Sequence, residues 1–348
     1  MLVLQNVPLA PLTTLQVGGP ARYFIEAKTI SEVSSAVELA RSQALPLFVL
    51  GGGSNLLISD AGWPGLVLKI AIAGIDEEHN DQKTVFEVGA GEVWDSFVAH
   101  AVAHNCAGIE CLSGIPGSVG GTPVQNVGAY GQEVADTIES VCVFDLKDNQ
   151  VRELCAEACA FSYRSSLFNT TGRGRYIILR VSFGLIPEGP ALVEYADVKR
   201  YFAGWSLPPT MAEVREAIKQ IRAQKGMLIS AGNADSRSAG SFFRNPVLSE
   251  EQFQDVTRRA LSRHLRIPNF PALEVQHKIS AAWLVEHSGF SRGYSVGNVG
   301  ISRKHALAII NRGSATAAEI VSLKDHIRQR VEEIWGIHLE PEPVFVGF

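Results

Sequence analysis

The sequence lacks the features that would mark a membrane protein, a disulfide-stabilised protein or a nucleic-acid-binding protein. Its longest stretch without a charged residue, 111–132, contains six glycines and two prolines, which argues against a membrane-spanning helix. The five cysteines are an odd number, which argues against a disulfide framework, and their spacing fits no metal site. A net charge of −5 provides no basic field for nucleic acid. No Gly-Lys-Ser or Gly-Lys-Thr phosphate loop occurs, so nucleotide hydrolysis is disfavoured.

Two further absences concern metals and cellular targeting. The nine histidines show no ligand spacing, so we expect structural roles for all of them and no metal site. The apolar residues at 1–4 have no basic flank and are soon followed by prolines, so we expect no targeting signal. Together with the cysteine content, this favours the reducing cytoplasm. The chain of 348 residues is long enough for two or three domains.

Glycine is concentrated in two places, and each cluster follows a short apolar run. The first cluster is Gly51-Gly52-Gly53-Ser54-Asn55, and the second is the segment from Gly114 to Gly121. Backbone N–H groups in such stretches can close on an anion, because no Cβ atom blocks the approach. Two such cradles suggest a ligand with a long phosphate-bearing spine, so a nucleotide cofactor is the first hypothesis. A plain turn is the alternative for each cluster.

The pattern of apolar and polar residues predicts a strand-rich α+β region over the first 190 residues, followed by a more helical part. A linker is expected at 203–209, where glycine and proline accumulate. Capping boxes at Thr29–Glu32 and Thr316–Glu319 mark the starts of two helices, and Gly336 ends the second. The expected strands are 21–27, 48–50, 66–70, 85–88, 140–146, 176–183 and 343–346, and the other expected helices are 92–104, 211–225, 278–286 and 305–311.

The first glycine cluster does not fit a Rossmann fold. In that fold a helix begins directly after the glycines, so that the pyrophosphate meets the helix N-terminus. Here Leu56-Leu57-Ile58-Ser59-Asp60 leads quickly to Gly62 and Pro64. A nucleotide site at these glycines would therefore belong to another fold.

At these residues the sequence resembles the UDP-N-acetylenolpyruvoylglucosamine reductases, a family of bacterial flavoenzymes that complete UDP-N-acetylmuramate synthesis. The resemblance covers nearly the whole chain and rests on several motifs that occur in the family's order. They are Thr13-Thr14 with Gly18-Gly19-Pro20-Ala21, the segments 51–57 and 114–131, Tyr163-Arg164-x-Ser166-x-Phe168, the segment 239–246, Ser302-Arg303-Lys304-His305-Ala306, and Leu339-Glu340-Pro341-Glu342.

The resemblance implies an α+β fold with an FAD-binding part of the vanillyl-alcohol-oxidase type, built from two α+β subdomains, and a separate α+β substrate-binding domain. The implied boundaries are 1–70 and 71–205 for the two FAD-binding subdomains and 206–320 for the substrate-binding domain, with 321–348 as a C-terminal helix and tail that return to the active site. The cofactor-binding residues that it implies are Gly51, Gly52, Gly53, Ser54, Asn55, Leu56, Ile115, Pro116, Gly117, Ser118, Gly120 and Gly121.

The reaction that the resemblance implies is the NADPH-dependent, FAD-mediated reduction of UDP-N-acetylglucosamine enolpyruvate to UDP-N-acetylmuramate. Arg164, Ser241 and Glu342 match the family's catalytic positions. Arg164 would bind the substrate carboxylate, Ser241 would give a proton to C2, and Glu342 would polarise the intermediate or act as an acid. The substrate-binding residues implied are Tyr130, Tyr163, Tyr195, Arg222, Lys225 and Asn245, with Tyr195 on a loop that marks one subtype of the family.

The chain departs from the family's pattern directly after Lys225. Many relatives continue with Leu-Pro-Asp-Pro, whereas this chain has Gly226-Met227-Leu228-Ile229-Ser230 and a longer loop. Three other functions stay open: a different flavin oxidoreductase such as an alcohol oxidase, a catalytically silent sugar-nucleotide sensor, and a Rossmann dehydrogenase without flavin. We expect a cytoplasmic monomer whose partners are small molecules rather than nucleic acid or a membrane.

Overall fold

The computed structural model describes residues 1–80, 82–230, 232–271 and 276–348. The chain forms two compact units, each assembled from segments that are far apart in the sequence. The first unit consists of Met1–Val7, Ala21–Gly53 and Trp63–Gln224, and the second of Pro8–Pro20, Ser54–Gly62 and Lys225–Phe348. The chain therefore passes between the units after residues 7, 20, 53, 62 and 224. Among the described residues, no helix combines the length and apolar character needed to cross a membrane.

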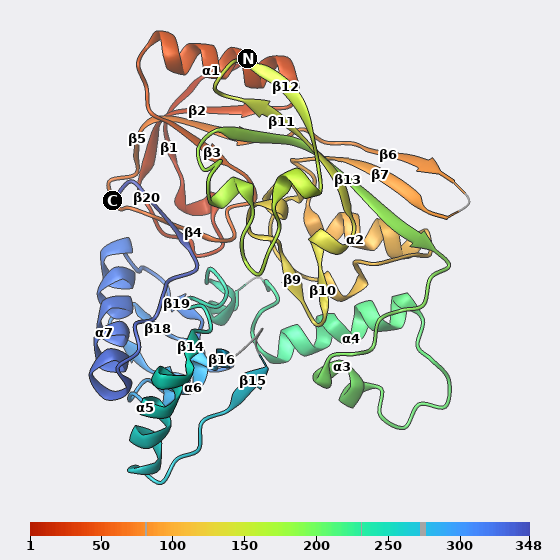
Figure 1. The fold of residues 1–348 in the computed structure, drawn as a ribbon. Helices are drawn as coiled ribbons and strands as arrows, with labels where there is room; N and C mark the ends of the chain where they lie inside the picture. Colours follow the sequence, from red (N-terminus) through yellow and green to blue (C-terminus); the bar gives the residue numbers. More distant parts are fainter. Residues whose placement is uncertain (81, 231, 272–275) are drawn as a thin grey trace. The chain divides into compact units, whose positions relative to one another are not determined.

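A mostly parallel sheet forms one part of the first unit (Figure 1). Its strand order is β1 (Leu4–Pro8), β2 (Pro20–Ala27), β5 (Trp63–Ile70) and β3 (Leu47–Leu50), and both β2 and β3 run parallel to β5. Helix α1 (Ile30–Ser42) joins β2 to β3 and packs on β5. It begins where the sequence predicted, because the Thr29 side chain accepts a 3.2 Å hydrogen bond from the Glu32 amide.

An antiparallel sheet forms the second part of this unit. Its strand order is β12 (Gln150–Cys155), β11 (Ile138–Asp145), β13 (Tyr176–Pro187), β7 (Thr84–Gly89) and β6 (Ile75–His79), and β8 (Cys106–Ala107) pairs with the end of β13. Helix α2 (Trp94–Ala103) follows β7. A small hairpin, β9 (Gly128–Ala129) with β10 (Gln132–Glu133), turns at Tyr130 and Gly131.

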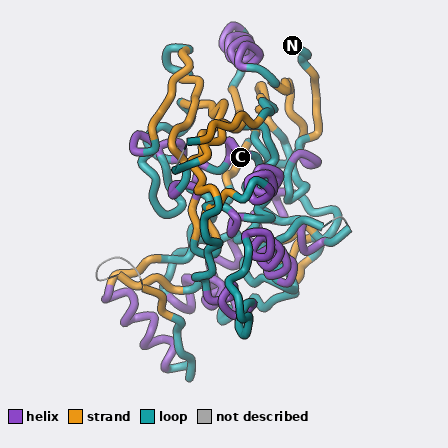
Figure 2. The backbone as a smooth tube through the Cα atoms, turned by 90° about the vertical axis from the view of Figure 1, so that its right-hand side faces the viewer, coloured by secondary structure: helices purple, strands orange, loops and turns teal. Residues whose placement is uncertain are grey.

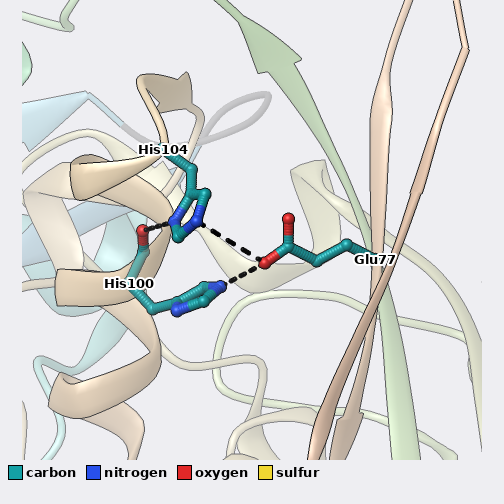
Figure 3. A group of neighbouring side chains, drawn as sticks. All are labelled: Glu77, His100 and His104. Atoms are coloured by element: carbon teal, nitrogen blue, oxygen red, sulfur yellow. Dashed lines mark hydrogen bonds and ion pairs between the residues drawn. The ribbon is translucent and has the colours of Figure 1, made fainter.

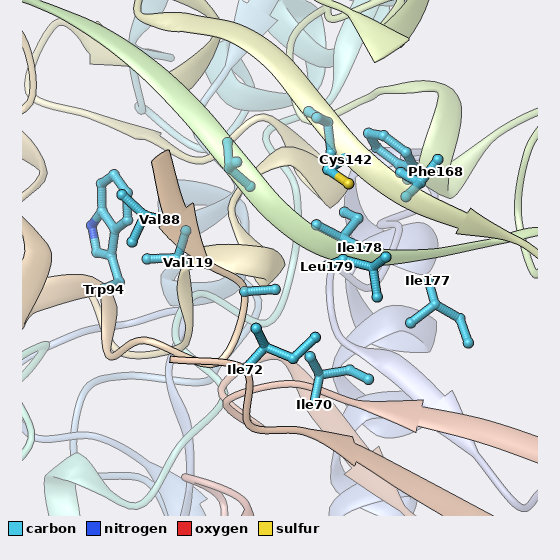
Figure 4. Packing of buried hydrophobic residues seen from close by; sticks show 14 of the residues in the cluster. Ile70, Ile72, Val88, Trp94, Val119, Cys142, Phe168, Ile177, Ile178 and Leu179 are labelled. Carbon is cyan, nitrogen blue, oxygen red and sulfur yellow. The ribbon is translucent and has the colours of Figure 1, made fainter. Parts of the chain in front are cut away.

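One hydrophobic core contains side chains from both of these sheets and from α1 and α2. Figure 4 shows part of it, with Trp94 of α2 beside Val88 of β7 and Val119, and with Ile70 and Ile72 nearby. Val119 belongs to the second glycine cluster and is fully buried. The core therefore fixes the position of a loop that the sequence predicted to bind a cofactor.

Two further helices complete the first unit. Helices α3 (Ala196–Tyr201) and α4 (Met211–Gln224) share a smaller core, in which Val198 and Phe202 pack with the buried face of α4 and with Cys111. The predicted linker 203–209 is the connection between these two helices. Short 3-10 helices lie at Glu110–Leu112, Val119–Gly121, Pro123–Gln125, Val134–Asp136, Glu157–Cys159 and Leu167–Asn169.

The second unit combines short strands with the helices α5, α6 and α7. Long loops connect many of the elements in the chain (Figure 2). Its strand groups are β14 (Val247–Ser249) with β16 (Gln276–Ile279) and β15 (Asn269–Pro271), β17 (Ser295–Val296) with β18 (Val299–Ile301) and β19 (Ile309–Asn311), and β4 (Leu56–Ile58) with β20 (Val344–Val346). Its helices are α5 (Glu250–Leu261), α6 (Ala281–Glu286) and α7 (Ala317–Trp335), with short 3-10 helices at Ala10–Leu12 and Ala234–Ser236.

Its core collects residues from all three segments of the unit. Leu15 and Leu57 come from the two early segments, and they join Phe242, Trp335 and Leu339 from the late one; all five are fully buried. Burial of such large side chains contributes about 1.5–3 kcal/mol each. The early segments are therefore integral parts of the second unit.

Two of the predicted helices are wrong at least in part. Residues 276–279 form strand β16, so only 281–286 of the predicted helix 278–286 is helical. The predicted helix 305–311 is a turn followed by strand β19. Strand β19 pairs with β18, and this pairing satisfies backbone groups that a helix would have bonded internally. Helices α3 and α5 were not predicted from the sequence.

Candidate functional site

The two glycine clusters meet in the first unit. A Cβ atom added to Gly52 would lie 2.5 Å from Gly117 Cα and 2.6 Å from the backbone nitrogen of Ser118, too close for any real side chain. A Cβ atom on Gly51 would lie 2.9 Å from Ser118 Oγ. The two loops therefore pass each other backbone to backbone, which only glycine permits. Residues predicted to bind one cofactor from two distant segments are thus neighbours.

The hydroxyl of Ser118 lies at this meeting point. Ser118 is buried, and its Oγ has no hydrogen-bond partner among the residues that the structure describes. Leaving a polar atom buried and unpaired costs about 1–3 kcal/mol. An unpaired hydroxyl between two glycine loops fits a site in which a polar ligand supplies the missing bond.

Part of the second cluster shapes the loop instead of presenting donors. The amides of Val119, Gly120 and Gly121 donate hydrogen bonds of 2.9 Å to the backbone carbonyls of Glu92, Ala90 and Ser118 respectively. A Cβ atom on Gly120 would lie 2.6 Å from the Ala90 side chain. Gly120 is therefore needed for close packing, whereas a Cβ atom on Gly121 would meet only Ser118 Oγ, at 3.9 Å. The preceding residues Ile115, Pro116 and Gly117 are half-buried, and the amides of Ile115 and Gly117 stay available for a phosphate contact.

An ion pair holds the start of the second cluster against the N-terminal end of α2. Asp95 Oδ1 accepts hydrogen bonds of 2.6 Å from the Gly114 amide and from Arg215 Nη1, and Asp95 Oδ2 accepts one of 2.9 Å from Arg215 Nη2. Desolvation by burial acts to raise the pKa of Asp95, but the hydrogen bonds from Arg215 and Gly114 outweigh it and hold the pKa below its usual value. The glycine loop is therefore tied to both α2 and α4.

Three of the predicted substrate-binding residues lie together in the first unit. Arg222 on α4 is buried, and its Nε donates a 3.2 Å hydrogen bond to the Gly114 carbonyl. Burial lowers the pKa of Arg222, while Tyr130 and Asp95 act to raise it. The rings of Tyr130 and Tyr195 meet edge to face, with centroids 5.4 Å apart. Tyr130, Tyr195 and Arg222 thus form one cluster next to the second glycine loop.

Glu110 was not predicted to have a role, and it positions the segment that carries Tyr195. Its side chain is completely buried, and its carboxylate accepts hydrogen bonds from the amides of Gly108, at 2.9 Å, and Leu192, at 2.8 Å. The Cys111 thiol also donates to the Leu192 carbonyl at 3.4 Å. The available sequence signal was a single charged residue inside the apolar run 109–112.

Arg164 has an unusual backbone conformation, and its guanidinium donates two hydrogen bonds. Its φ angle is +54°, in the left-handed region that non-glycine residues rarely adopt. Its guanidinium donates to the carbonyls of Gly128, at 2.9 Å, and Asn126, at 3.4 Å, and lies 5.7 Å from the ring centre of Tyr163. Arg164 and the exposed Tyr163 therefore lie beside the β9–β10 hairpin that carries Tyr130.

In the second unit, Ser241 and Glu342 lie on adjacent segments. The Glu342 amide donates a 2.9 Å hydrogen bond to the Phe242 carbonyl, and the Arg244 amide donates one of 3.0 Å to the Glu340 carbonyl. Phe242 and Phe243 are buried, whereas Ser241 and Glu342 are half-buried. Two predicted catalytic residues separated by 101 positions are thus brought together. Arg164 belongs to the other unit, so its convergence with this pair stays a prediction.

The end of the first glycine cluster joins the same place. Asn55 Nδ2 donates a 3.2 Å hydrogen bond to the Glu342 carbonyl, and Asn55 in turn accepts one of 2.9 Å from the Val344 amide. Leu56 then begins β4, which pairs in parallel with β20. Thr14 Oγ1 contacts the carbonyls of Ser54, at 3.2 Å, and Ser238, at 2.7 Å. Within the second unit, Asn55 and Leu56, which are predicted to bind the cofactor, are therefore held next to the segment of Glu342 by one strand pair.

Lys225, Asn245 and Gly53 are the remaining predicted residues. Lys225 directly follows α4 and begins the late segment of the second unit. Asn245 Oδ1 accepts a 2.9 Å hydrogen bond from the Ala281 amide, at the start of α6. Next to it, the buried Nε of Arg244 has no hydrogen-bond partner among the described residues. Gly53 has a φ of +64°, in the left-handed region that glycine adopts without strain.

Comparison with known proteins gives two matches to family models and several relatives that span the chain. A model of the UDP-N-acetylenolpyruvoylglucosamine reductase C-terminal domain matches residues 232–346, and a model of an FAD binding domain matches 21–154. The UDP-N-acetylenolpyruvoylglucosamine reductase of Thermobifida fusca is 42% identical over 99% of this chain and 98% of its own length. That of Streptomyces coelicolor is 44% identical over 99% of this chain and 90% of its own length.

A solved structure extends the likeness to the fold. The crystal structure of UDP-N-acetylenolpyruvylglucosamine reductase from Thermus caldophilus matches with a TM-score of 0.68 and 28% identity, and covers 99% of both chains. This match and the FAD binding domain confirm the predicted α+β fold with an FAD-binding part. The identity to the curated relatives extends over the whole chain, and so the chain belongs to the UDP-N-acetylenolpyruvoylglucosamine reductase family.

Proposed function

We propose that this chain is an FAD-dependent oxidoreductase that uses NADPH to reduce UDP-N-acetylglucosamine enolpyruvate to UDP-N-acetylmuramate, a precursor of bacterial peptidoglycan. The observation that carries the proposal is the contact between the glycine loops at Gly52 and Gly117, within a chain whose residues 21–154 match an FAD binding domain. The identity of the substrate is inferred from the relatives that are named UDP-N-acetylenolpyruvoylglucosamine reductase.

The residues at this contact fit FAD. Gly51, Gly52 and Gly117 leave no side chain between the loops, and Ser118 Oγ offers an unpaired polar atom there. Residues 51–56 and 115–118 would hold the cofactor, and the backbone hydrogen bonds of Gly120 and Gly121 would keep the second loop in shape. When bound and reduced by NADPH, FAD supplies the hydride that the substrate receives.

Three residues of this chain would handle the charge and the proton of the reaction. Hydride addition to the methylene carbon of the enolpyruvyl group leaves negative charge on C2 and the carboxylate. The two-donor guanidinium of Arg164 suits that carboxylate, because a planar fork matches both oxygens as the charge grows. The Ser241 hydroxyl would give its proton to C2, and Glu342, held beside it, would stabilise the intermediate or serve as an acid.

The nucleotide part of the substrate would be held mainly by the cluster of Tyr130, Tyr195 and Arg222. A buried arginine next to two tyrosines is suited to a diphosphate, since it offers fixed positive charge and hydroxyl donors. Tyr163, Lys225 and Asn245 would complete this part of the site. Because Tyr195 is 46% exposed and its segment is anchored by Glu110, the proposal includes the subtype in which a tyrosine loop covers the diphosphate.

The proposal extends to the setting in which the enzyme works. Its partners would be small molecules, namely NADPH and the enolpyruvyl nucleotide, since a net charge of −5 provides no general attraction to nucleic acid. We expect a cytoplasmic monomer, and light scattering during size-exclusion chromatography measures the mass directly.

An anaerobic absorbance titration tests the proposed reaction. Purified protein is loaded with FAD, NADPH is added, and UDP-N-acetylglucosamine enolpyruvate follows. We expect the flavin colour to bleach with NADPH and to return with the nucleotide. Bleaching without recovery would point to another acceptor, as for a different flavin oxidoreductase. Bound flavin that never bleaches would favour a sugar-nucleotide sensor. Failure to bind FAD at all would reject the hypothesis that the two glycine loops bind this cofactor.

A further inference from the structure

Three side chains of the first unit converge at a place that none of the predicted functions uses. Glu77 lies on β6, and His100 and His104 lie one turn apart at the end of α2 (Figure 3). One nitrogen from each histidine and one oxygen from Glu77 all lie within 4.8 Å of one another. Glu77 Oε1 is in hydrogen-bond contact with His100 Nε2 and lies 3.9 Å from His104 Nε2. Both imidazoles therefore present the same nitrogen to one carboxylate.

The other nitrogen of His104 has a partner that fixes its tautomer. His104 Nδ1 lies 2.8 Å from the backbone carbonyl of His100, which can only accept a hydrogen bond. Nδ1 therefore carries the proton, and neutral His104 keeps a lone pair on Nε2, facing Glu77. A metal-binding histidine usually donates its other ring N–H to a group such as a backbone carbonyl, as His104 does here.

The surroundings support a defined site at a partly exposed surface. The His100 ring packs edge to face on buried Phe86, with centroids 5.9 Å apart, and lies 4.1 Å from the His104 ring. His79 Nε2 lies 3.8 Å from the second oxygen of Glu77, so a third imidazole is nearby. Glu77 and His100 are half-buried, whereas His104 is exposed, which leaves a path for an ion from solvent.

We propose that Glu77, His100 and His104 form a binding site for a divalent transition metal, with Zn²⁺ as the preferred ion. Two imidazole nitrogens and one carboxylate oxygen are ligands that Zn²⁺ accepts, with water in the fourth tetrahedral position. Ligand distances near 2.0–2.2 Å require ligand atoms about 3.3 Å apart. The three ligand atoms already lie within 4.8 Å of one another, so small side-chain rotations would bring them to that spacing.

The site would join two elements that are distant in the sequence. Glu77 comes from the β6–β7 hairpin and the histidines come from α2, whose first turn holds the second glycine loop through Asp95. A bound ion would therefore clamp the hairpin to the far end of this helix. The proposal does not depend on the reductase activity, since none of the three ligands belongs to the predicted cofactor or substrate residues.

Metal titration of tag-free protein tests the proposal. Co²⁺ is added first, because a tetrahedral site with nitrogen ligands gives strong visible absorption, and Zn²⁺ is then used to displace it. His104→Gln and Glu77→Gln each remove one ligand at a partly exposed position. His287→Gln is the matched control: His287 also caps a helix, its Nδ1 lies 2.8 Å from the carbonyl of Trp283 four residues earlier, and its ring stacks on that residue at 4.2 Å.

We expect one equivalent of Co²⁺ per chain in wild type and in His287→Gln, displaced by Zn²⁺. In His104→Gln and Glu77→Gln, the affinity should fall at least about tenfold. Zn²⁺ should also raise the melting temperature of wild type and lose that effect in the two ligand variants, provided that circular dichroism shows them folded. Equal affinity in all four proteins, or no binding by wild type, would overturn the proposal.

Discussion

Replacing Gly52 by alanine tests the contact on which the cofactor site is built. The added Cβ atom would lie 2.5 Å from Gly117 Cα, whereas carbon atoms normally stay about 3.5–4.0 Å apart. The obstacle is backbone on both sides, so the loops must separate by about 1 Å or more. Overpacking of this kind costs about 1–3 kcal/mol. Because tenfold in affinity corresponds to about 1.4 kcal/mol, we expect FAD binding to weaken by about 5- to 150-fold.

The assay is a titration of apoprotein with FAD, followed by quenching of flavin fluorescence. Two further glycine variants test whether the loss of FAD affinity follows the severity of the steric clash. Gly51→Ala meets only the Ser118 hydroxyl, at 2.9 Å, and should have a smaller effect. Gly313→Ala, in the second unit, meets nothing within 4 Å and should bind like wild type. Denaturant unfolding of each apoprotein separates lost affinity from lost stability. If folded Gly52→Ala binds FAD within about threefold of wild type, the close approach of the loops does not matter for the cofactor.

Three other substitutions test separate parts of the structure. Ser241→Ala should leave flavin reduction by NADPH unchanged and slow reoxidation by the enolpyruvyl substrate by about 10²- to 10⁴-fold. Stopped-flow absorbance measures both rates, with Ser291→Ala, at an exposed serine, as the control. Equal reoxidation rates in the variant and wild type would show that Ser241 is not the proton donor. Asp95→Asn should lower the free energy of unfolding at neutral pH by about 1–3 kcal/mol, because Arg215 loses its ion pair. Since the folded-state pKa of Asp95 is depressed, its contribution is present above the unfolded pKa and is lost as the pH falls through the folded value, so urea unfolding should show wild type and variant converging in acid. Glu110→Ala should release the Leu192 amide and raise the rate of proteolysis near Tyr195, and unchanged proteolysis would mean that Glu110 does not anchor that segment.

The parts of the fold that the sequence predicted are those determined by local interactions. The predicted helix starts at Thr29 and Thr316 are confirmed, each with the threonine side chain accepting a hydrogen bond from the amide three residues later. Only Thr316 forms the complete capping box, because at the other start the Glu32 carboxylate accepts from the Lys28 amide instead of the Thr29 amide. Gly336 ends α7 with a φ of +70°, a conformation that glycine adopts without strain. Each of these signals lies within one turn of helix, so a single segment of sequence contains it.

The predictions of secondary structure are wrong where pairing with a strand that is distant in the sequence determines the conformation. Ala306–Ile310 is a short apolar run, and such a run is compatible with either a helix or a buried strand. Pairing of β19 with β18 decides for the strand. In the same way, β16 is fixed by its pairing with β14. Periodicity within the segment could not reveal either partner.

The candidate site was predictable as a list of residues but not as an arrangement. Glycine content pointed to both loops, yet the contact between Gly52 and Gly117 depends on the tertiary fold. The same holds for Ser241 and Glu342, which are joined through backbone bonds at Phe242. His100 and His104 are four residues apart in the sequence, and the expectation of no metal site stays untested beside the proposal made for them. Their partner Glu77 comes from another strand, so the spacing alone was a weak signal.

The interleaved segments of the two units have a consequence for synthesis on the ribosome. Pro8–Pro20 and Ser54–Gly62 belong to the second unit, but its remaining segment begins only at Lys225. At about 5–20 residues per second, roughly 8 to 33 seconds separate translation of Gly62 from that of Lys225. During this interval the apolar residues Leu15 and Leu57 lack the neighbours that later bury them. Strand β4 must wait longer still, because its partner β20 begins at Val344, 119 residues after Lys225.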